Sequence, residues 1–270
     1  MIRDISAERT DTLRTHIRGV LSRRPAWSAE LASFEAEAAW IIGDWTTVEQ
    51  VGTRAPPIAQ ALLAMRDKKA LDSSLITARR ELGNNITSHQ YFRSYDSILQ
   101  LHLLREIEMI SHANRSIQQT KDPVNHRVIT QQISRDVIKS LDERFSTTSP
   151  SFRVREAILT IRRTAFGLVD APQLKSQLGQ AWIQSSKIAR KAGYEQTAYS
   201  ATLQAKEAEA PFAFLQQAKL LRAHGGAFKA LTDLENAVNP LLHGPNLDLT
   251  DDGFLTDRNL AKVRDVIWRR

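Results

Sequence analysis

The sequence has no cysteine, and glycine and proline are scarce, with 11 and 9 of the 270 residues. The absence of cysteine excludes disulfides, thiolate catalysis and cysteine-ligated zinc, and it suits a reducing intracellular compartment. No run of about 18 apolar residues is present, so no membrane span is expected, and the polar N-terminus is not a secretory signal. Because the few glycines and prolines lie mostly between periodic segments, we expect a largely helical chain.

The short motifs of common catalytic and cofactor sites are also missing. No phosphate-binding G-x-x-x-x-G-K-[ST] loop, G-x-G-x-x-G turn, G-x-S-x-G elbow or H-E-x-x-H helix occurs. The seven histidines lack paired metal-ligand spacing, and His102 is expected to pack with a hydrogen bond. Glu106 and Glu108 face different sides of a helix, which favours surface ion pairs over a paired-carboxylate site. The sequence therefore predicts no catalytic, cofactor-binding or metal-binding residue in this chain.

Acidic residues are in deficit, with 30 Asp and Glu against 37 Lys and Arg, which gives a net charge of +7. Eleven of the arginines lie in three groups: Arg14, Arg18, Arg23 and Arg24; Arg153, Arg155, Arg162 and Arg163; and Arg264, Arg269 and Arg270. Acidic residues lie near most of them, and the aromatics fall on apolar helix faces rather than between the cations. We interpret these groups as solvated helix faces, not as a nucleic-acid surface. Binding of an acidic partner protein remains open.

Apolar residues recur at helical spacing through residues 1–145, which we interpret as N-terminal helical repeats. Gly43 should end the second helix, and the Asp44 side chain should cap the next. Thr87 with Gln90 has the pattern of a capping box before a long helix. Helical stretches are expected at residues 9–23, 28–42, 58–82 and 128–145, with a buried stripe of Phe92, Tyr95, Leu99, Leu103, Ile107 and Ile110 and a polar loop at 114–125.

A linker at residues 146–150 separates this part from C-terminal repeats at residues 151–240. Ser149 and Pro150 are expected to be the N-cap and first helical residue after the linker. Pro240 should end the last repeat, residues 241–256 should form an irregular connection, and residues 257–270 should begin one more helix. A chain that stops inside a periodic helix indicates a piece of a longer protein.

Residues 178–238 are the most informative stretch, because they contain two successive helix-turn-helix units. Superposing Gly193 on Gly225 gives an offset of 32 residues. The same offset relates the alanine pairs Ala198 and Ala230, and Ala205 and Ala237. A period of about 34 residues is typical of tetratricopeptide repeats. We therefore predict an all-α fold, a tetratricopeptide-like α-solenoid of antiparallel helix pairs. One contiguous core is expected from Trp182, Ile188, Leu220 and Leu231.

Three segments, in order, resemble one known family. They are EAEAAW with the following GDW at residues 35–45, the stretch from Tyr95 through LHLLREIE at residues 101–108, and KIARKAGYEQTAY at residues 187–199. Together they resemble the FAT domain of ATR-type checkpoint kinases, a branch of the phosphatidylinositol-3-kinase-related protein kinases, and its fungal members in particular. The resemblance covers roughly residues 27–240.

The resemblance implies that the chain is a scaffold. In this family the FAT solenoid wraps around a serine/threonine kinase domain, supports it and transmits activation in response to DNA damage. The implied partners are the kinase domain and remaining repeats of a parent chain, together with an obligate partner protein, in the nucleus. ATP and Mg²⁺ are implied only through a kinase domain missing from this chain. The most recognisable segment supplies candidate interface or packing residues: Arg190, Lys191, Gly193, Tyr194, Gln196 and Tyr199.

Within this set, Gly193 should supply a turn conformation that a Cβ atom would penalise. Tyr194 and Tyr199 are expected to bury their rings while a hydroxyl reaches a partner. Arg190 and Lys191 are expected either to lie on ordinary repeat surface or to contact the kinase domain or the obligate partner. The sequence leaves interface and packing roles open.

Asp257-Arg258-Asn259 superficially resembles the start of a catalytic loop. No asparagine follows at the required spacing, and no Asp-Phe-Gly lies downstream. We therefore expect that this chain alone is not an enzyme. Two other functions remain open: an independent tetratricopeptide-like adaptor for a peptide or an acidic protein, and an unrecognised enzyme with a deep pocket.

Overall fold

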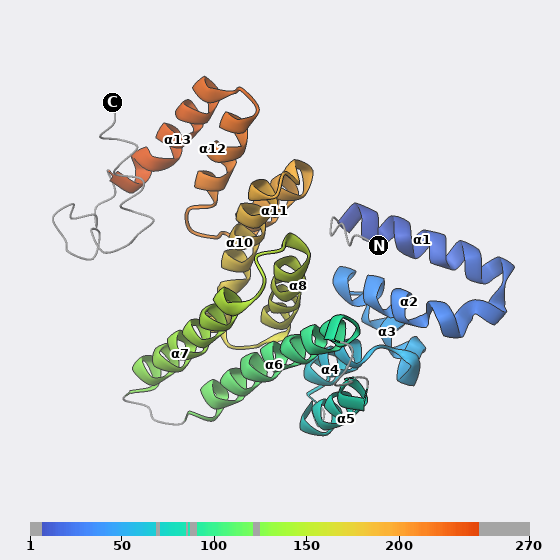
Figure 1. Ribbon diagram of the computed structural model, residues 1–270. Coiled ribbons are helices and arrows are strands. Elements are labelled where there is room, and N and C mark those ends of the chain that lie inside the picture. Colours follow the sequence, from blue (N-terminus) through green and yellow to red (C-terminus); the bar gives the residue numbers. More distant parts are fainter. Residues whose placement is uncertain (1–6, 69–70, 85, 87–90, 121–124, 243–270) are drawn as a thin grey trace.

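The helices pack as successive antiparallel pairs in the computed structural model, which describes residues 7–68, 71–84, 86, 91–120 and 125–242 (Figure 1). All regular structure within those ranges is helical, which confirms the predicted all-α fold. The helices are α1 (Ala7–Arg23), α2 (Ser28–Ile42), α3 (Trp45–Val51), α4 (Pro57–Arg66), α5 (Leu71–Asn84), α6 (Tyr91–Gln119), α7 (His126–Thr147), α8 (Phe152–Leu168), α9 (Pro172–Lys175), α10 (Gln177–Lys191), α11 (Glu195–Glu207), α12 (Ala213–Ala223) and α13 (Ala227–Leu242).

The turn between α2 and α3 forms as the sequence predicts. Gly43 has a positive φ of 87°, and the Asp44 carboxylate accepts a hydrogen bond from the Thr47 N–H at 3.2 Å. Hydrogen bonds from the Thr46 and Thr47 hydroxyls hold the pKa of Asp44 far below its usual range. Gly43 therefore ends α2, and charged Asp44 caps α3 and contacts Arg14 of α1.

The main hydrophobic core lies among α2 to α6 and α8. Leu62, Leu104, Ile107 and Ile158 are fully buried there. Of the predicted α6 stripe, Leu103, Ile107 and Ile110 are buried, and Tyr95 and Leu99 pack partly buried against the same core. This core therefore joins the N-terminal helices to the middle of the chain.

Four predicted boundaries in the described residues are wrong. The stretch at 58–82 consists of two helices, because α4 ends at Arg66. The polar loop begins later than expected, since α6 continues to Gln119 and buries Ile117. The linker residue Ser151, not Ser149, precedes the first residue of α8. The last helix continues past Pro240 to Leu242. The expected capping box at Thr87 and Gln90 and the expected elements after residue 242 lie outside the described residues.

Helix α8 is buried on nearly all sides, although it carries charged residues. Glu156, Arg162 and Arg163 are 2%, 3% and 5% exposed. The prediction that these arginines form a solvated face is therefore wrong. Since an unpaired buried charge is very unfavourable, each of the three must have a partner within the core.

Arg162 pairs with Glu106, which is fully buried on α6. The Arg162 Nε donates a hydrogen bond to Glu106 Oε2 at 2.7 Å, and Arg162 Nη1 reaches Asp142 at 3.1 Å. On the other carboxylate oxygen of Glu106, His102 Nε2 lies at 3.3 Å and Arg144 Nε at 3.5 Å. Burial alone would raise the pKa of Glu106, but His102 and the Arg162 guanidinium outweigh it and hold the pKa below its ordinary value. The charged contacts thus join α6, α7 and α8.

Arg163 forms a second buried ion pair on the neighbouring side of α8. Its Nη2 donates hydrogen bonds to Glu156 at 2.8 Å and to the Thr160 hydroxyl at 2.9 Å. The Ser185 hydroxyl of α10 donates to the other Glu156 oxygen at 2.5 Å. The Arg163 guanidinium also lies 4.0 Å from the centroid of the Trp182 ring. These contacts attach the C-terminal repeats to α8.

The two predicted repeats are the pairs α10–α11 and α12–α13. Gly193 and Gly225 both have a φ of 81° at the corresponding turns, which confirms the offset of 32 residues. The prediction of one contiguous core is wrong. Trp182 packs with Ala205, Ala210 and Ala213, whereas Leu220 packs with Ala189 and Ala198 in a separate cluster, and Leu231 is 37% exposed. The alanine-rich faces of α10 to α13 let these helices pack closely. Because alanine side chains are small, the apolar clusters between the helices are small as well.

Replacing Gly193 by Ala should destabilise the chain by about 1–2 kcal/mol, because a Cβ atom disfavours its left-handed conformation. Gly167 is the matched control, since it lies in α8 without positive φ and a Cβ there would meet no atom within 4 Å. Gly167→Ala should be neutral or stabilise by about 0.5–1 kcal/mol. Urea unfolding followed by circular dichroism compares the two, and equal effects would contradict the assignment of Gly193 to a strained turn.

Glu106→Gln should lower the free energy of unfolding by about 3–5 kcal/mol, because it leaves Arg162 buried without its counter-charge. Glu108 lies on the same helix but pairs with Arg79 and Arg105 at the surface. Glu108→Gln should therefore cost less than about 1 kcal/mol. Thermal unfolding at neutral pH measures both changes.

The Glu106 pair should also contribute to acid sensitivity. Its folded pKa lies below the ordinary value of 4.5, so its stabilisation is complete above about pH 4.5 and is lost as the pH falls through the folded pKa. Between pH 6 and pH 3 the melting temperature of Glu106→Gln should therefore fall less than that of the unmodified chain. An identical decrease in both proteins would show that Glu106 contributes nothing to acid unfolding.

Candidate functional site

The candidate residues from the sequence lie at the turn between α10 and α11. Arg190 and Lys191 end α10, and Gln196 and Tyr199 lie on α11. The Tyr194 N–H donates to the Ala189 carbonyl at 2.9 Å, and the Gly193 N–H donates to the Arg190 carbonyl at 3.3 Å. The left-handed Gly193 makes this closure of the helix end possible. The structure thus brings the six residues to one corner of the repeat.

Aromatic packing attaches this corner to α8. The rings of Tyr194 and Phe152 stack with centroids 4.4 Å apart, and Phe152 packs against the cluster formed by Ala189, Ala198 and Leu220. The expectation that both tyrosines bury their rings is wrong, because Tyr194 is 36% and Tyr199 is 54% exposed. The turn therefore has a packed inner side and a tyrosine-bearing outer side.

The polar candidates form a surface, not a cleft. Lys191 and Gln196 are exposed, and Arg190 is half-buried with a Nε atom that is shielded from solvent and has no hydrogen-bond partner. The next turn along the chain approaches this one, since His224 Nε2 lies 3.6 Å from the Glu195 carboxylate. Such a convex, charged corner can bind another protein but does not enclose a small substrate.

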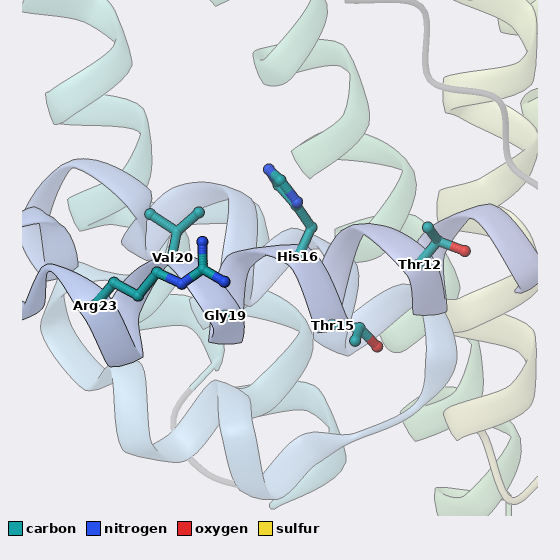
Figure 2. Close-up of a pocket in the computed structure, with 6 residues that line it drawn as sticks. All are labelled: Thr12, Thr15, His16, Gly19, Val20 and Arg23. Carbon is teal, nitrogen blue, oxygen red and sulfur yellow. The ribbon is translucent and has the colours of Figure 1, made fainter.

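The two pockets found among the described residues do not bring together side chains that could form a reaction centre. One of about 490 Å³ lies beside α1, and Figure 2 shows that its lining side chains come from one helix and that His16 and Thr15 point in different directions. Another of about 450 Å³ lies between α11, α12 and α13, with Lys206 and Asp233 in its lining. Within the described ranges, no group of three histidine, aspartate or glutamate side chains is placed to hold a metal ion.

The most important residues that the sequence interpretation missed are the buried charges. His102 was expected to pack with a hydrogen bond, and its Nδ1 does lie 3.1 Å from Arg144 Nη2. Glu106 was expected at the surface, yet it is fully enclosed by cationic side chains. A signal was present, because Glu106 lies three residues after buried Leu103 and four before buried Ile110, on the same helix face.

No described helix combines the length and apolarity that crossing a bilayer requires.

Comparison with known proteins gives a coherent result. The family model described as FAT domain matches residues 32–270. The chain is 25% identical over 249 residues to the serine/threonine-protein kinase ATR of Arabidopsis thaliana and 26% identical over 233 residues to that of Drosophila melanogaster. It is 23% identical over 244 residues to the ATR kinase of Oryza sativa subsp. indica.

These alignments cover 79–84% of this chain but only 9% of each relative. The match to the family model includes α2 to α13, the buried charge contacts and the turn at Gly193. It therefore covers nearly the whole described structure except α1. The chain belongs to the FAT domain family.

Proposed function

We propose that this chain is a segment of the helical scaffold of an ATR-type DNA-damage checkpoint serine/threonine kinase. In this proposal it supports and regulates a kinase domain carried by another part of the parent protein. Membership of the FAT family and similarity to three kinases named ATR support it, and the chain spans about a tenth of their length.

The attachment of both halves to α8 is the structural observation that carries the scaffold role. On one side Arg162 pairs with Glu106 of α6, and on the other Glu156 accepts a hydrogen bond from Ser185 of α10. In this proposal a displacement of α10 reaches the buried charges of α6 and α7 through these contacts on α8. Such a connection of packed and hydrogen-bonded side chains is one way in which a support can respond to a kinase domain.

The proposed partners are the kinase domain and the other helical repeats of the parent chain, together with the obligate partner protein of the checkpoint kinase. The proposed compartment is the nucleus. ATP and Mg²⁺ belong to the kinase domain in this proposal, because phosphoryl transfer needs the lysine, aspartate and asparagine groups of that domain. An independent peptide-binding adaptor is not favoured, since the family match extends over residues 32–270.

The purified chain should transfer no phosphate from ATP. The elements that bind ATP phosphates and metal ions are absent from its sequence. The measurement is incorporation of labelled phosphate into the chain and into a generic substrate, compared with a mock preparation. Transfer that disappears after substitution of a residue in this chain would show that the segment has catalysis of its own.

In the complete kinase, Trp182→Ala should lower both the melting temperature and the stimulated kinase activity, because it removes the ring that Arg163 contacts at 4.0 Å. The change should cost about 3 kcal/mol where the ring is packed. Trp182→Phe is the control, since it keeps an aromatic face for Arg163 and should restore most of the activity. A destabilised Trp182→Ala kinase with full activity would contradict the scaffold role.

A further inference from the structure

Charge is distributed unequally between the two ends of the α10–α13 helices. Both glycine turns lie at one end, together with Arg190, Lys191 and Arg222, and we call this end the turn edge (Figure 1). Glu207 and Glu209 lie at the opposite end, where α11 connects to α12. Lys206 lies at that opposite end too, but the two acidic residues outnumber it, so the excess of positive charge is on the turn edge.

The basic residues of the turn edge occupy equivalent positions in the two repeats. Arg190 and Arg222 are separated by the same 32 residues as Gly193 and Gly225. Their carbonyls accept equivalent hydrogen bonds, from the Gly193 N–H at 3.3 Å and from the Gly225 N–H at 3.2 Å. Because Glu195 and His224 lie 3.6 Å apart, the two turns are neighbours, and their cations form one surface.

Stabilisation of the helix ends does not account for these cations. The C-terminal carbonyls already have backbone partners, since the Tyr194 N–H donates to Ala189 and the Gly226 N–H donates to Leu221. The described structure gives Arg190, Lys191 and Arg222 no carboxylate within ion-pair distance. The Nε of Arg190 is moreover shielded from solvent without an acceptor, which is unfavourable for a guanidinium. The exposed Lys191 and Arg222 side chains can donate hydrogen bonds to an incoming carboxylate.

We propose that the turn edge binds an acidic segment of a partner protein, with Arg190 and Arg222 as the principal contacts and Lys191 beside them. A guanidinium matches a carboxylate through two parallel hydrogen bonds. The inference rests on the proposed scaffold function, and it specifies that the partner segment bound beside the α10–α11 turn is acidic. Two repeats present their arginines in register, so the segment that fits carries carboxylates at two or more positions.

Protein carboxylates fit this surface better than nucleic acid does. Aromatic exposure does not separate the two ligands, because the Tyr194 ring is stacked on Phe152 but Tyr199 and Phe228 are 54% and 84% exposed near the two turns. The difference lies in the arrangement of charge. The Glu195 carboxylate also lies within the turn edge, beside His224, where it repels a continuous phosphate backbone but tolerates separated side chains.

The test uses the 270-residue chain and a fluorescein-labelled peptide of four Glu-Glu-Gly repeats, followed by fluorescence anisotropy at 50 mM and 300 mM NaCl. The triple variant Arg190→Ala, Lys191→Ala, Arg222→Ala should bind about tenfold more weakly at the lower salt, which is the sum of one half-buried and two exposed contacts. The control variant Arg127→Ala, Arg135→Ala, Lys206→Ala removes the same charge from exposed positions elsewhere. It should bind like the unmodified chain.

Equal weakening in both triple variants, or no binding by the unmodified chain, would overturn the proposal. So would a twelve-residue oligothymidine that binds as tightly as the peptide and depends on the same residues, because the surface would then select phosphate. If the first triple variant has a lowered melting temperature, the exposed single variants Lys191→Ala and Arg222→Ala replace it, and each should weaken binding by about twofold. Failure here leaves the scaffold function intact, because the Trp182 variants test that function through kinase activity.

Discussion

Two buried guanidinium–carboxylate contacts on α8 determine how the remaining helices are arranged. Arg162 reaches Glu106 on α6, and Arg163 holds Glu156, which accepts a hydrogen bond from Ser185 on α10. Removing charges from water is so unfavourable that such pairs add little net stability compared with an apolar core. Their effect is on specificity, because a helix that slipped along α8 would leave a charge buried without a partner. The position of each half of the chain on α8 is fixed in this way.

Local patterns in the sequence were sufficient to predict the helix pairs and their turns. Gly43, Gly193 and Gly225 have the positive φ values that their positions indicated, because a helix end with a left-handed residue depends on only a few neighbouring residues. Boundaries were harder to predict where tertiary packing decides them. Residues 114–119 are polar enough for a loop, yet they continue α6 because Ile117 is buried in the core. Here packing outweighed local preference.

The burial of Arg162 was beyond local patterns for a different reason, although the position of Glu106 on the apolar face of α6 was a signal for the burial of its partner. A basic residue near acidic ones indicates solvent exposure in most helices, and only the three-dimensional contact with Glu106 shows that Arg162 is enclosed. The sequence located the turn at Gly193 correctly, but it did not predict that Tyr194 and Tyr199 are exposed. Whether a ring is buried depends on which helix of the array lies beside it, and the sequence of one repeat does not determine that neighbour. The residue types were enough to identify the repeat, but the exposure and contacts of its side chains could be determined only from the structure.

The graded size of the clusters along the chain has a mechanical consequence. Thirty of the described residues form the buried core around α2 to α9, whereas among the described side chains of α12 and α13 the cluster that joins these helices buries only Leu215 and Leu234. When the two ends of such an array are pulled apart, the same tension acts on every helix pair in series, and the least-packed pair separates first. In the C-terminal part, α12 and α13 therefore separate before α10 detaches from α8. A force applied through the C-terminal end would therefore extend the α12–α13 pair before it disturbed the buried ion pairs of α8.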